Sequence, residues 1–162
     1  MNRCDKAVYY AQKQVEHCGP YVWGGQGEKL SKLTAQKLAG METSAENAAR
    51  VERFIYNNRK RFDSQTKIYD CSGLVCCALI YAGILKSGSD YTAQGLYNTF
   101  KTVNINSRKP GDLIFKGTGT ANITHVGIVK DLVTVIEAKG RDYGCIESTI
   151  DGSWIYAARP EY

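Results

Sequence analysis

The amino-acid sequence predicts an α+β fold in which helices come first along the chain and an antiparallel β-sheet follows them. Apolar residues recur at helical spacing in the N-terminal part, whereas short runs rich in β-branched residues, separated by turn residues, follow Pro110. The chain also contains no internal repeat, low-complexity tract or linker. We therefore expect one domain over residues 1–162.

The composition is that of a globular protein and excludes several other classes. With 43% hydrophobic and 23% charged residues, a chain of 162 residues builds a substantial core and is neither disordered nor fibrous. No apolar stretch approaches the roughly 20 residues of a membrane helix, and the N-terminus lacks the apolar core of a secretory signal. The net charge of +5 suits an anionic partner such as a cell wall, but no basic run is interleaved with aromatics. We thus expect neither membrane insertion nor a nucleic-acid partner.

The first expected helix carries an apolar stripe and leads into a glycine-rich turn. Its stripe residues, spaced three and four apart, are Cys4, Val8, Ala11, Val15 and Cys18. The helix is expected to end at Gly19-Pro20. Residues 21–27 then contain three glycines, which indicates a tight turn where backbone segments approach closely. No Gly-Lys-Ser/Thr follows, and this argues against a phosphate loop.

Residues 29–66 are polar and basic and are expected to form a helical insertion. Thr43 and Glu46 form a capping-box pattern that predicts a helix start. Apolar residues follow at helical spacing, namely Ala48, Val51, Phe54 and Ile55. The basic end of the segment, residues 57–61, is expected to be a solvated face.

A nearly unbroken apolar run predicts a buried central helix from Ser72 to Leu85. A helix that is apolar on all sides is a buried one, so Cys76 and Cys77 are expected to pack in the core. A short helix is expected near residues 92–100. The strands are then expected at residues 113–115, 124–129, 132–138, 145–150 and 154–158, with a loop at residues 117–120.

Cys71 is a candidate nucleophile because of its place at the first turn of the buried helix. The amides and dipole at a helix N-terminus stabilise an anion, and this is expected to lower the thiol pKa. The same amides can bind the oxyanion that forms when a thiolate attacks a carbonyl. Gly73 is expected to let a substrate approach the backbone.

His125 is the candidate base, and Glu137 is the candidate for its orienting acid. A hairpin that turns at Asp131 places the two residues directly opposite each other, with Cβ atoms about 5 Å apart. A carboxylate there orients the imidazole and favours its charged form. The alternative is a strand histidine bonded within the core opposite a surface glutamate, and the presence of Cys71 favours the catalytic interpretation. The other histidine, His17, is expected to cap the first helix.

Asp70 allows two interpretations, because an anion beside a nucleophile raises the thiol pKa and so costs reactivity. It either caps the buried helix or binds a cationic part of the substrate. The six cysteines contain no Cys-x-x-Cys pair, so we expect reduced thiols and neither a metal site nor a cofactor.

Four motifs then appear in a characteristic order, and together they span most of the chain. They are Tyr21-Val22-Trp23-Gly24-Gly25, Asp70-Cys71-Ser72-Gly73-Leu74-Val75, Pro110-Gly111-Asp112-Leu113 and Thr124-His125-Val126-Gly127-Ile128-Val129. In this the chain resembles the NlpC-type (NlpC/p-sixty) cell-wall cysteine peptidases, which are papain-like in fold. The resemblance implies a papain-like α+β fold whose nucleophile begins a buried helix packed on the antiparallel sheet.

The resemblance also implies roles for individual residues. Cys71 is the nucleophile, His125 the base and Glu137 the third catalytic residue, a position that is more often histidine, asparagine or glutamine in the family. Tyr21 lies over the active site near the oxyanion. Asp70 and Ser72 help to hold the free amino end of a peptidoglycan stem peptide. The stretch between Gly25 and Asp70 is much longer than in the compact family form.

The expected function is therefore that of a cysteine endopeptidase acting on bacterial peptidoglycan. The bond that the resemblance implies joins γ-D-glutamate to the diamino acid of the stem peptide. The expected setting is the cell wall, reached either as a phage endolysin released by a holin or as the module of a larger protein. The alternatives are an N-acetylmuramoyl-L-alanine amidase or a transferase on the same fold, or a non-catalytic wall-binding module.

Overall fold

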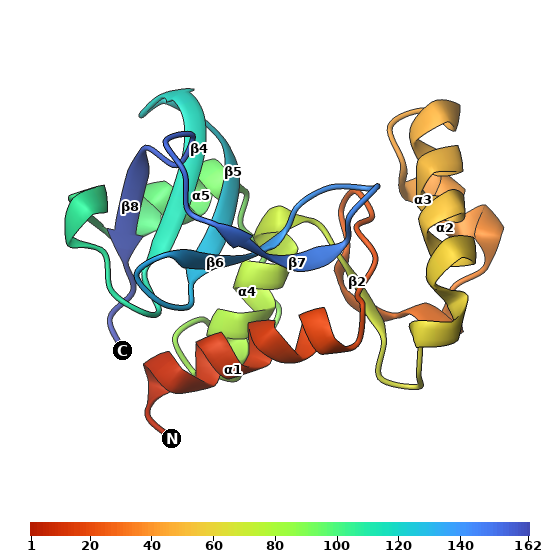
Figure 1. Cartoon of the computed structure of the whole chain (residues 1–162), viewed down its shortest axis with the longest axis horizontal. Helices are drawn as coiled ribbons and strands as arrows, with labels where there is room; N and C mark the ends of the chain where they lie inside the picture. Colours follow the sequence, from red (N-terminus) through yellow and green to blue (C-terminus); the bar gives the residue numbers. More distant parts are fainter.

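The computed structural model describes all 162 residues, and it confirms the predicted α+β class. A six-stranded antiparallel sheet has the strand order β3-β8-β4-β5-β6-β7, and helices α1, α4 and α5 pack on it (Figure 1). The helices are α1 (Arg3–Glu16), α2 (Ala35–Met41), α3 (Ala45–Asn58), α4 (Cys71–Tyr81) and α5 (Ala93–Thr99). The strands are β1 (Gln26–Lys29), β2 (Lys67–Tyr69), β3 (Lys101–Val103), β4 (Leu113–Gly119), β5 (Asn122–Val129), β6 (Thr134–Ala138), β7 (Cys145–Thr149) and β8 (Tyr156–Arg159). No helix is both long enough and apolar enough to cross a membrane.

Both faces of the large sheet are buried, because alternate residues of its strands enter two separate apolar clusters. The main core lies against α1, α4 and α5 and takes Leu113, Ile128 and Ile136 from the sheet. The neighbouring residues of the same strands point to the opposite face. There they form a smaller cluster of Ile114, Val129, Val135, Trp154 and Ala157.

Helix α4 is buried as predicted and places its first residue, Cys71, at the edge of the main core. Cys76 is fully buried, which confirms its expected place in the core. Cys77 is half-buried, and its thiol donates to the backbone carbonyl of Gln26 in β1 over 3.3 Å. Cys77 therefore packs between α4 and the small β1–β2 sheet.

The predicted stripe of α1 is confirmed in its middle, where Ala11 is buried and Val8 and Val15 pack against the main core, but not at its two cysteines. The buried residues of the helix are Ala7, Ala11 and Gln14, and the two alanines allow α1 to pack closely on α4. Cys4 is only half-buried, and Cys18 lies beyond the helix end in a left-handed conformation, with φ of 53°. The α1 helix ends earlier than predicted, so Cys18 is buried by the turn that follows and not by the helix.

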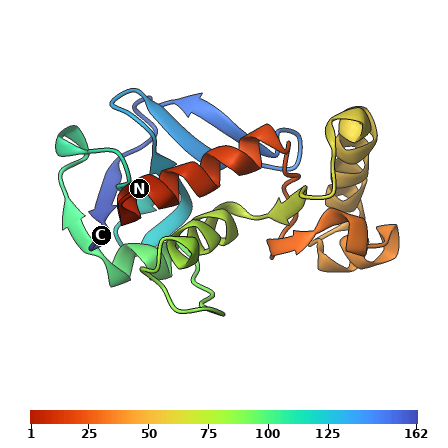
Figure 2. The same ribbon diagram turned by 90° about the horizontal axis from the view of Figure 1, so that it is seen from below.

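Residues 30–61 form a lobe that stands apart from the large sheet, with α2 and α3 side by side (Figures 1 and 2). Helix α3 was predicted, but its cap is Ser44, which accepts from the backbone N–H of Asn47, and not Thr43. Helix α2 and the short strands β1, β2 and β3 were not predicted. Short 3₁₀ helices, Leu30–Lys32, Arg59–Arg61 and Ile105–Ser107, flank these elements.

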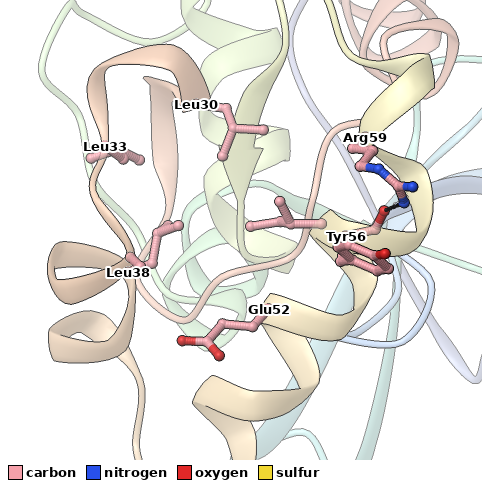
Figure 3. Close-up of a pocket in the computed structure, with 8 residues that line it drawn as sticks. Leu30, Leu33, Leu38, Glu52, Tyr56 and Arg59 are labelled. Carbon is pink, nitrogen blue, oxygen red and sulfur yellow. Dashed lines mark hydrogen bonds between the residues drawn. The ribbon is translucent and has the colours of Figure 1, made fainter.

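The lobe has its own apolar contacts and a surface hollow. Val22, Leu38, Val51 and Ile68 form a buried cluster that joins the lobe to strand β2 and to the glycine-rich turn. Figure 3 shows a hollow of about 420 Å³ between α2 and α3, in which Tyr56 and Arg59 lie on one side. It contains no cysteine or histidine, so it is separate from the candidate chemistry.

Candidate active site

A cleft of about 470 Å³ brings together five of the six predicted site residues. Its lining includes Tyr21, Asp70, Cys71, Ser72 and His125. The sixth residue, Glu137, is 1% exposed and lies behind the histidine, away from the cleft surface. The topology thus joins the glycine-rich turn, the start of α4 and one end of β5 at a single place.

The Cys71 thiol has a higher pKa than the sequence argument predicted. Burial and, to a lesser extent, the neighbouring Asp70 carboxylate together raise the pKa of Cys71 to about 12, because hydrogen bonds from the backbone N–H groups of Val126 and Ser72 oppose them only in part. The helix-terminal amides act in the expected direction, but the loss of hydration is larger. A thiolate at Cys71 therefore depends on a base that takes its proton.

His125 and Glu137 form a direct contact, with 2.5 Å between Nε2 of the imidazole and Oε2 of the carboxylate. Burial acts to raise the pKa of Glu137, but the hydrogen bond from His125 and the charges of His125 and Lys116 act against it, and the pKa lies below its usual value. Glu137 is accordingly an anion at neutral pH. Its bond to Nε2 leaves Nδ1 as the ring nitrogen available to exchange a proton.

The register that produces this contact differs from the predicted one by two residues. Ile128 pairs with Ile136 and Val129 with Val135, so Glu137 lies diagonally from His125 and not directly opposite. The cause is Asp131, whose carboxylate accepts from the backbone N–H groups of residues 133 and 134 and moves the turn along the chain. A shift of two residues preserves the face of a strand, so both side chains remain on one face.

A β-bulge and an indole ring fix the orientation of His125. Lys116 pairs with His125 and Gly117 with Ile123, so Thr124 is the extra residue of a bulge beside the histidine. This pairing also shows that residues 117–119 belong to β4, where a loop was predicted. The ring of His125 lies 5.4 Å from that of Trp154, between centroids. Trp154 was not predicted as a site residue, since it is distant in sequence and lies in no motif.

Asp70 caps helix α4 and also holds the glycine-rich turn. Its Oδ1 accepts from the backbone N–H of Gly73 at 2.7 Å, and its Oδ2 accepts from that of Gly24 at 3.0 Å. Ser72 donates its hydroxyl to the same carboxylate at 3.3 Å. Burial raises the pKa of Asp70 above its usual value, although these hydrogen bonds oppose the shift. The capping interpretation is thus observed, and the carboxylate still borders the cleft.

Gly73 has a different role from the one predicted. A Cβ atom there would lie 2.0 Å from the backbone carbonyl oxygen of Gly25. The group that approaches Gly73 is therefore the glycine-rich turn and not a substrate. The prediction of a close backbone approach at that turn is confirmed.

Two further residues, which the sequence did not indicate, lie next to the cleft wall at Tyr21. Arg141, in the β6–β7 connection, lies 5.5 Å from the Tyr21 ring centroid and forms an ion pair with Glu42 at the end of α2. Burial, with the nearby Cys71 and Asp70 charges, raises the pKa of Tyr21, so its phenol stays neutral. His17, by contrast, lies outside the cleft at the end of α1, where its Nδ1 contacts Asp63 at 2.9 Å.

Comparison with known proteins gives one family. Residues 18–158 match the model of the NlpC/P60 family. No curated protein sequence matches this chain significantly.

Solved structures of the same family share the fold. The P60 domain of a Mycobacterium avium subspecies paratuberculosis antigen superposes with a TM-score of 0.61 and 19% identity, covering 98% of each chain. The peptidoglycan hydrolase RipB of Mycobacterium tuberculosis has a TM-score of 0.61 and 24% identity, covering 98% of this chain and 67% of its own. RipD of the same organism, described as a non-catalytic domain adapted to peptidoglycan binding, has a TM-score of 0.63 and 19% identity, covering 98% of each chain.

Proposed function

This chain belongs to the NlpC/P60 family of peptidoglycan hydrolases, and we propose that it is itself an active cysteine endopeptidase that cleaves peptidoglycan stem peptides. The observation that carries the proposal is the buried contact between Glu137 and His125 in the cleft that holds Cys71. A binding module has no need of a buried carboxylate kept ionised by a histidine. We propose further that residues 1–162 act as one domain, with residues 29–66 as an insertion.

The proposed reaction starts with proton transfer from the Cys71 thiol to Nδ1 of His125. The Glu137 carboxylate stabilises the imidazolium, which offsets the raised pKa of the buried thiol. The thiolate then attacks the amide carbon, and the backbone N–H groups at the start of α4 stabilise the oxyanion. The imidazolium gives its proton to the leaving amine as the C–N bond breaks. Water, deprotonated by His125, hydrolyses the thioester and restores the thiol.

The proposed substrate is a stem peptide with a free amino end, cut between γ-D-glutamate and the diamino acid. Asp70 and Ser72 line the cleft and would receive that amine. Both Asp70 oxygens already accept a backbone N–H, but an ionised carboxylate has about four lone-pair sites and can accept further bonds. Tyr21, neutral and beside Cys71, is placed to donate its hydroxyl toward the oxyanion.

An amidase or a transferase on this fold would use the same thiol chemistry on a different bond, whereas a wall-binding module such as RipD would use none. Delivery as a phage endolysin released by a holin, or as the module of a larger protein, is compatible with each of the catalytic variants.

Mass spectrometry of purified peptidoglycan, and separately of stem peptides with a free amino end, tests the proposal after each has been digested by the protein. We expect fragments with a new γ-D-glutamate carboxyl end and a new amino end on the diamino acid. Free L-alanine amino ends released from muramic acid would instead identify an amidase. Binding without cleavage of either substrate would identify a binding module and would overturn the proposal.

A further inference from the structure

We propose that the buried Glu42–Arg141 ion pair makes the α2–α3 lobe part of the active site, because it positions the cleft wall formed by Tyr21 and Trp23. This inference rests on the proposed function and assigns positioning residues to it. Glu42 ends α2, whereas Arg141 lies in the β6–β7 connection, which reaches from the sheet toward the lobe (Figure 1). The pair therefore joins the lobe to the strand that carries Glu137.

Both partners of the ion pair are largely buried, and Glu42 completely so. The Glu42 side chain is 0% exposed and that of Arg141 is 14% exposed. Nε of Arg141 donates to Oε2 of Glu42 at 2.8 Å, and Nη2 lies 2.7 Å from the same oxygen. A buried ion pair gives little net stability, because desolvation of the charges offsets their attraction, but it does fix one geometry. In this fold the pair therefore serves to hold the lobe and the β6–β7 connection in one relative position.

The second oxygen of Glu42 reaches the cleft wall directly. It accepts from the backbone N–H of Trp23 at 3.0 Å. The N–H groups on either side, of Val22 and Gly24, are bound by Tyr69 in β2 and by Asp70 at the start of α4. Of these three consecutive amides, the outer two are therefore held by the adjacent residues Tyr69 and Asp70, and the lobe holds the middle one through Glu42.

Arg141 contacts the same cleft wall at Tyr21. Its guanidinium carbon lies 5.5 Å from the ring centroid of Tyr21, within the range of a cation–π contact. Tyr21 and Trp23 both line the cleft with Cys71. A misplacement of about 1 Å at such a wall can reduce catalysis roughly a hundredfold.

The chain offers a matched control in a second ion pair between the same two segments. Arg50 in α3 donates to Asp142, the neighbour of Arg141, through Nε at 3.1 Å and Nη2 at 2.8 Å. This pair is exposed, with 36% and 49% of the side chains accessible, and contacts no residue of the cleft. An exposed pair of this kind contributes little.

The test compares Arg141→Lys and Glu42→Asp with Arg50→Lys. The first two variants keep both charges, so neither leaves a buried charge unpaired. Arg141→Lys loses the planar guanidinium and its several N–H donors. Glu42→Asp is one methylene shorter and no longer reaches the backbone N–H of Trp23. The readouts are time-resolved fluorescence anisotropy, melting temperature, and kcat/KM on a stem peptide with a free amino end. The chain has two tryptophans, and Trp154 is 3% exposed in the sheet whereas Trp23 is 52% exposed. The Trp23→Phe variant retains only the fluorescence of Trp154, so the part of the anisotropy decay that it loses comes from Trp23.

We expect Arg141→Lys and Glu42→Asp to add a fast anisotropy decay and to lower kcat/KM by roughly tenfold or more, with a cooperative melting transition retained. Arg50→Lys should leave both values unchanged. Anisotropy equal to that of Arg50→Lys would overturn the proposal, and so would faster Trp23 motion with an unchanged kcat/KM. If the parent protein cleaves no stem peptide, the proposed function fails, and the anisotropy comparison still decides whether the pair positions the wall.

Discussion

At the scale of single residues, we expect Glu137 to set the pH dependence of the proposed reaction, because it contacts His125 directly. Glutamine at this position keeps the size and an acceptor oxygen but removes the charge that stabilises the His125 imidazolium. We expect Glu137→Gln to fold and to keep some activity, well above that of His125→Ala. The alkaline limb of its profile of kcat/KM against pH should move to lower pH. An unchanged rate and profile would leave a Cys71–His125 dyad with another orienting group.

Asp70 has one observed role and one proposed role, and a single substitution separates them. Asp70→Asn keeps one acceptor oxygen, which can still cap the N–H of Gly73, but it loses the second acceptor, which binds the N–H of Gly24, and the negative charge. If the carboxylate binds the substrate amine, this variant should weaken cleavage of peptides with a free amino end far more than that of acetylated peptides. Equal losses on both substrates would mean that Asp70 serves only as a cap.

At the scale of elements, helix α4 carries cysteines with distinct functions. Cys76 is fully buried in the main core, so Cys76→Ala removes packing without touching the cleft. We expect a loss of about 1 kcal/mol in the free energy of unfolding, with kcat/KM close to that of the parent. Chemical denaturation monitored by circular dichroism measures the first value. A stable variant that no longer cleaves peptidoglycan would contradict the assignment of Cys76 to the core.

The elements that were predicted from the sequence are those whose patterns are strong locally. The unbroken apolar run of α4 and the alternating residues of β4 to β8 depend on neighbours in sequence, and they were found. Strands β1, β2 and β3 have three or four residues each, too few for a pattern, and they form only through pairing with distant segments. The face shared by His125 and Glu137 was predicted correctly. The register was not, because an aspartate side chain set the turn.

At the scale of the whole molecule, the cleft depends on segments that no local pattern connects. The Glu42–Arg141 pair joins residues 99 positions apart, and His125 contacts the ring of Trp154 from another part of the sheet. Sequence motifs identified five residues that line the cleft. The residues that hold them in place became visible only in the folded structure, because their spacing in sequence carries no signal.

The stability of the whole protein should also depend on Glu137 in acid. The pKa of Glu137 is lowered in the folded state, so its contribution is present above the unfolded value of about 4.3 and is lost as the pH falls through the folded value. We expect the free energy of unfolding to fall less steeply with decreasing pH in Glu137→Gln than in the parent. Glu147→Gln is the comparison: the pKa of Glu147 is also lowered, by Lys130, but the pair is exposed, so this variant should change the slope less than Glu137→Gln does. Identical slopes in the parent and Glu137→Gln would exclude this linkage.

The central claim is that the Cys71 thiol, activated by His125 and Glu137, hydrolyses peptidoglycan. The measurement that tests it most directly is the rate at which purified peptidoglycan releases soluble fragments with the parent protein and with Cys71→Ala, at matched melting temperature. We predict fragment release by the parent and none above background by Cys71→Ala, whose fold should be intact because the thiol borders the cleft. Release by folded Cys71→Ala at the parent rate would contradict the claim.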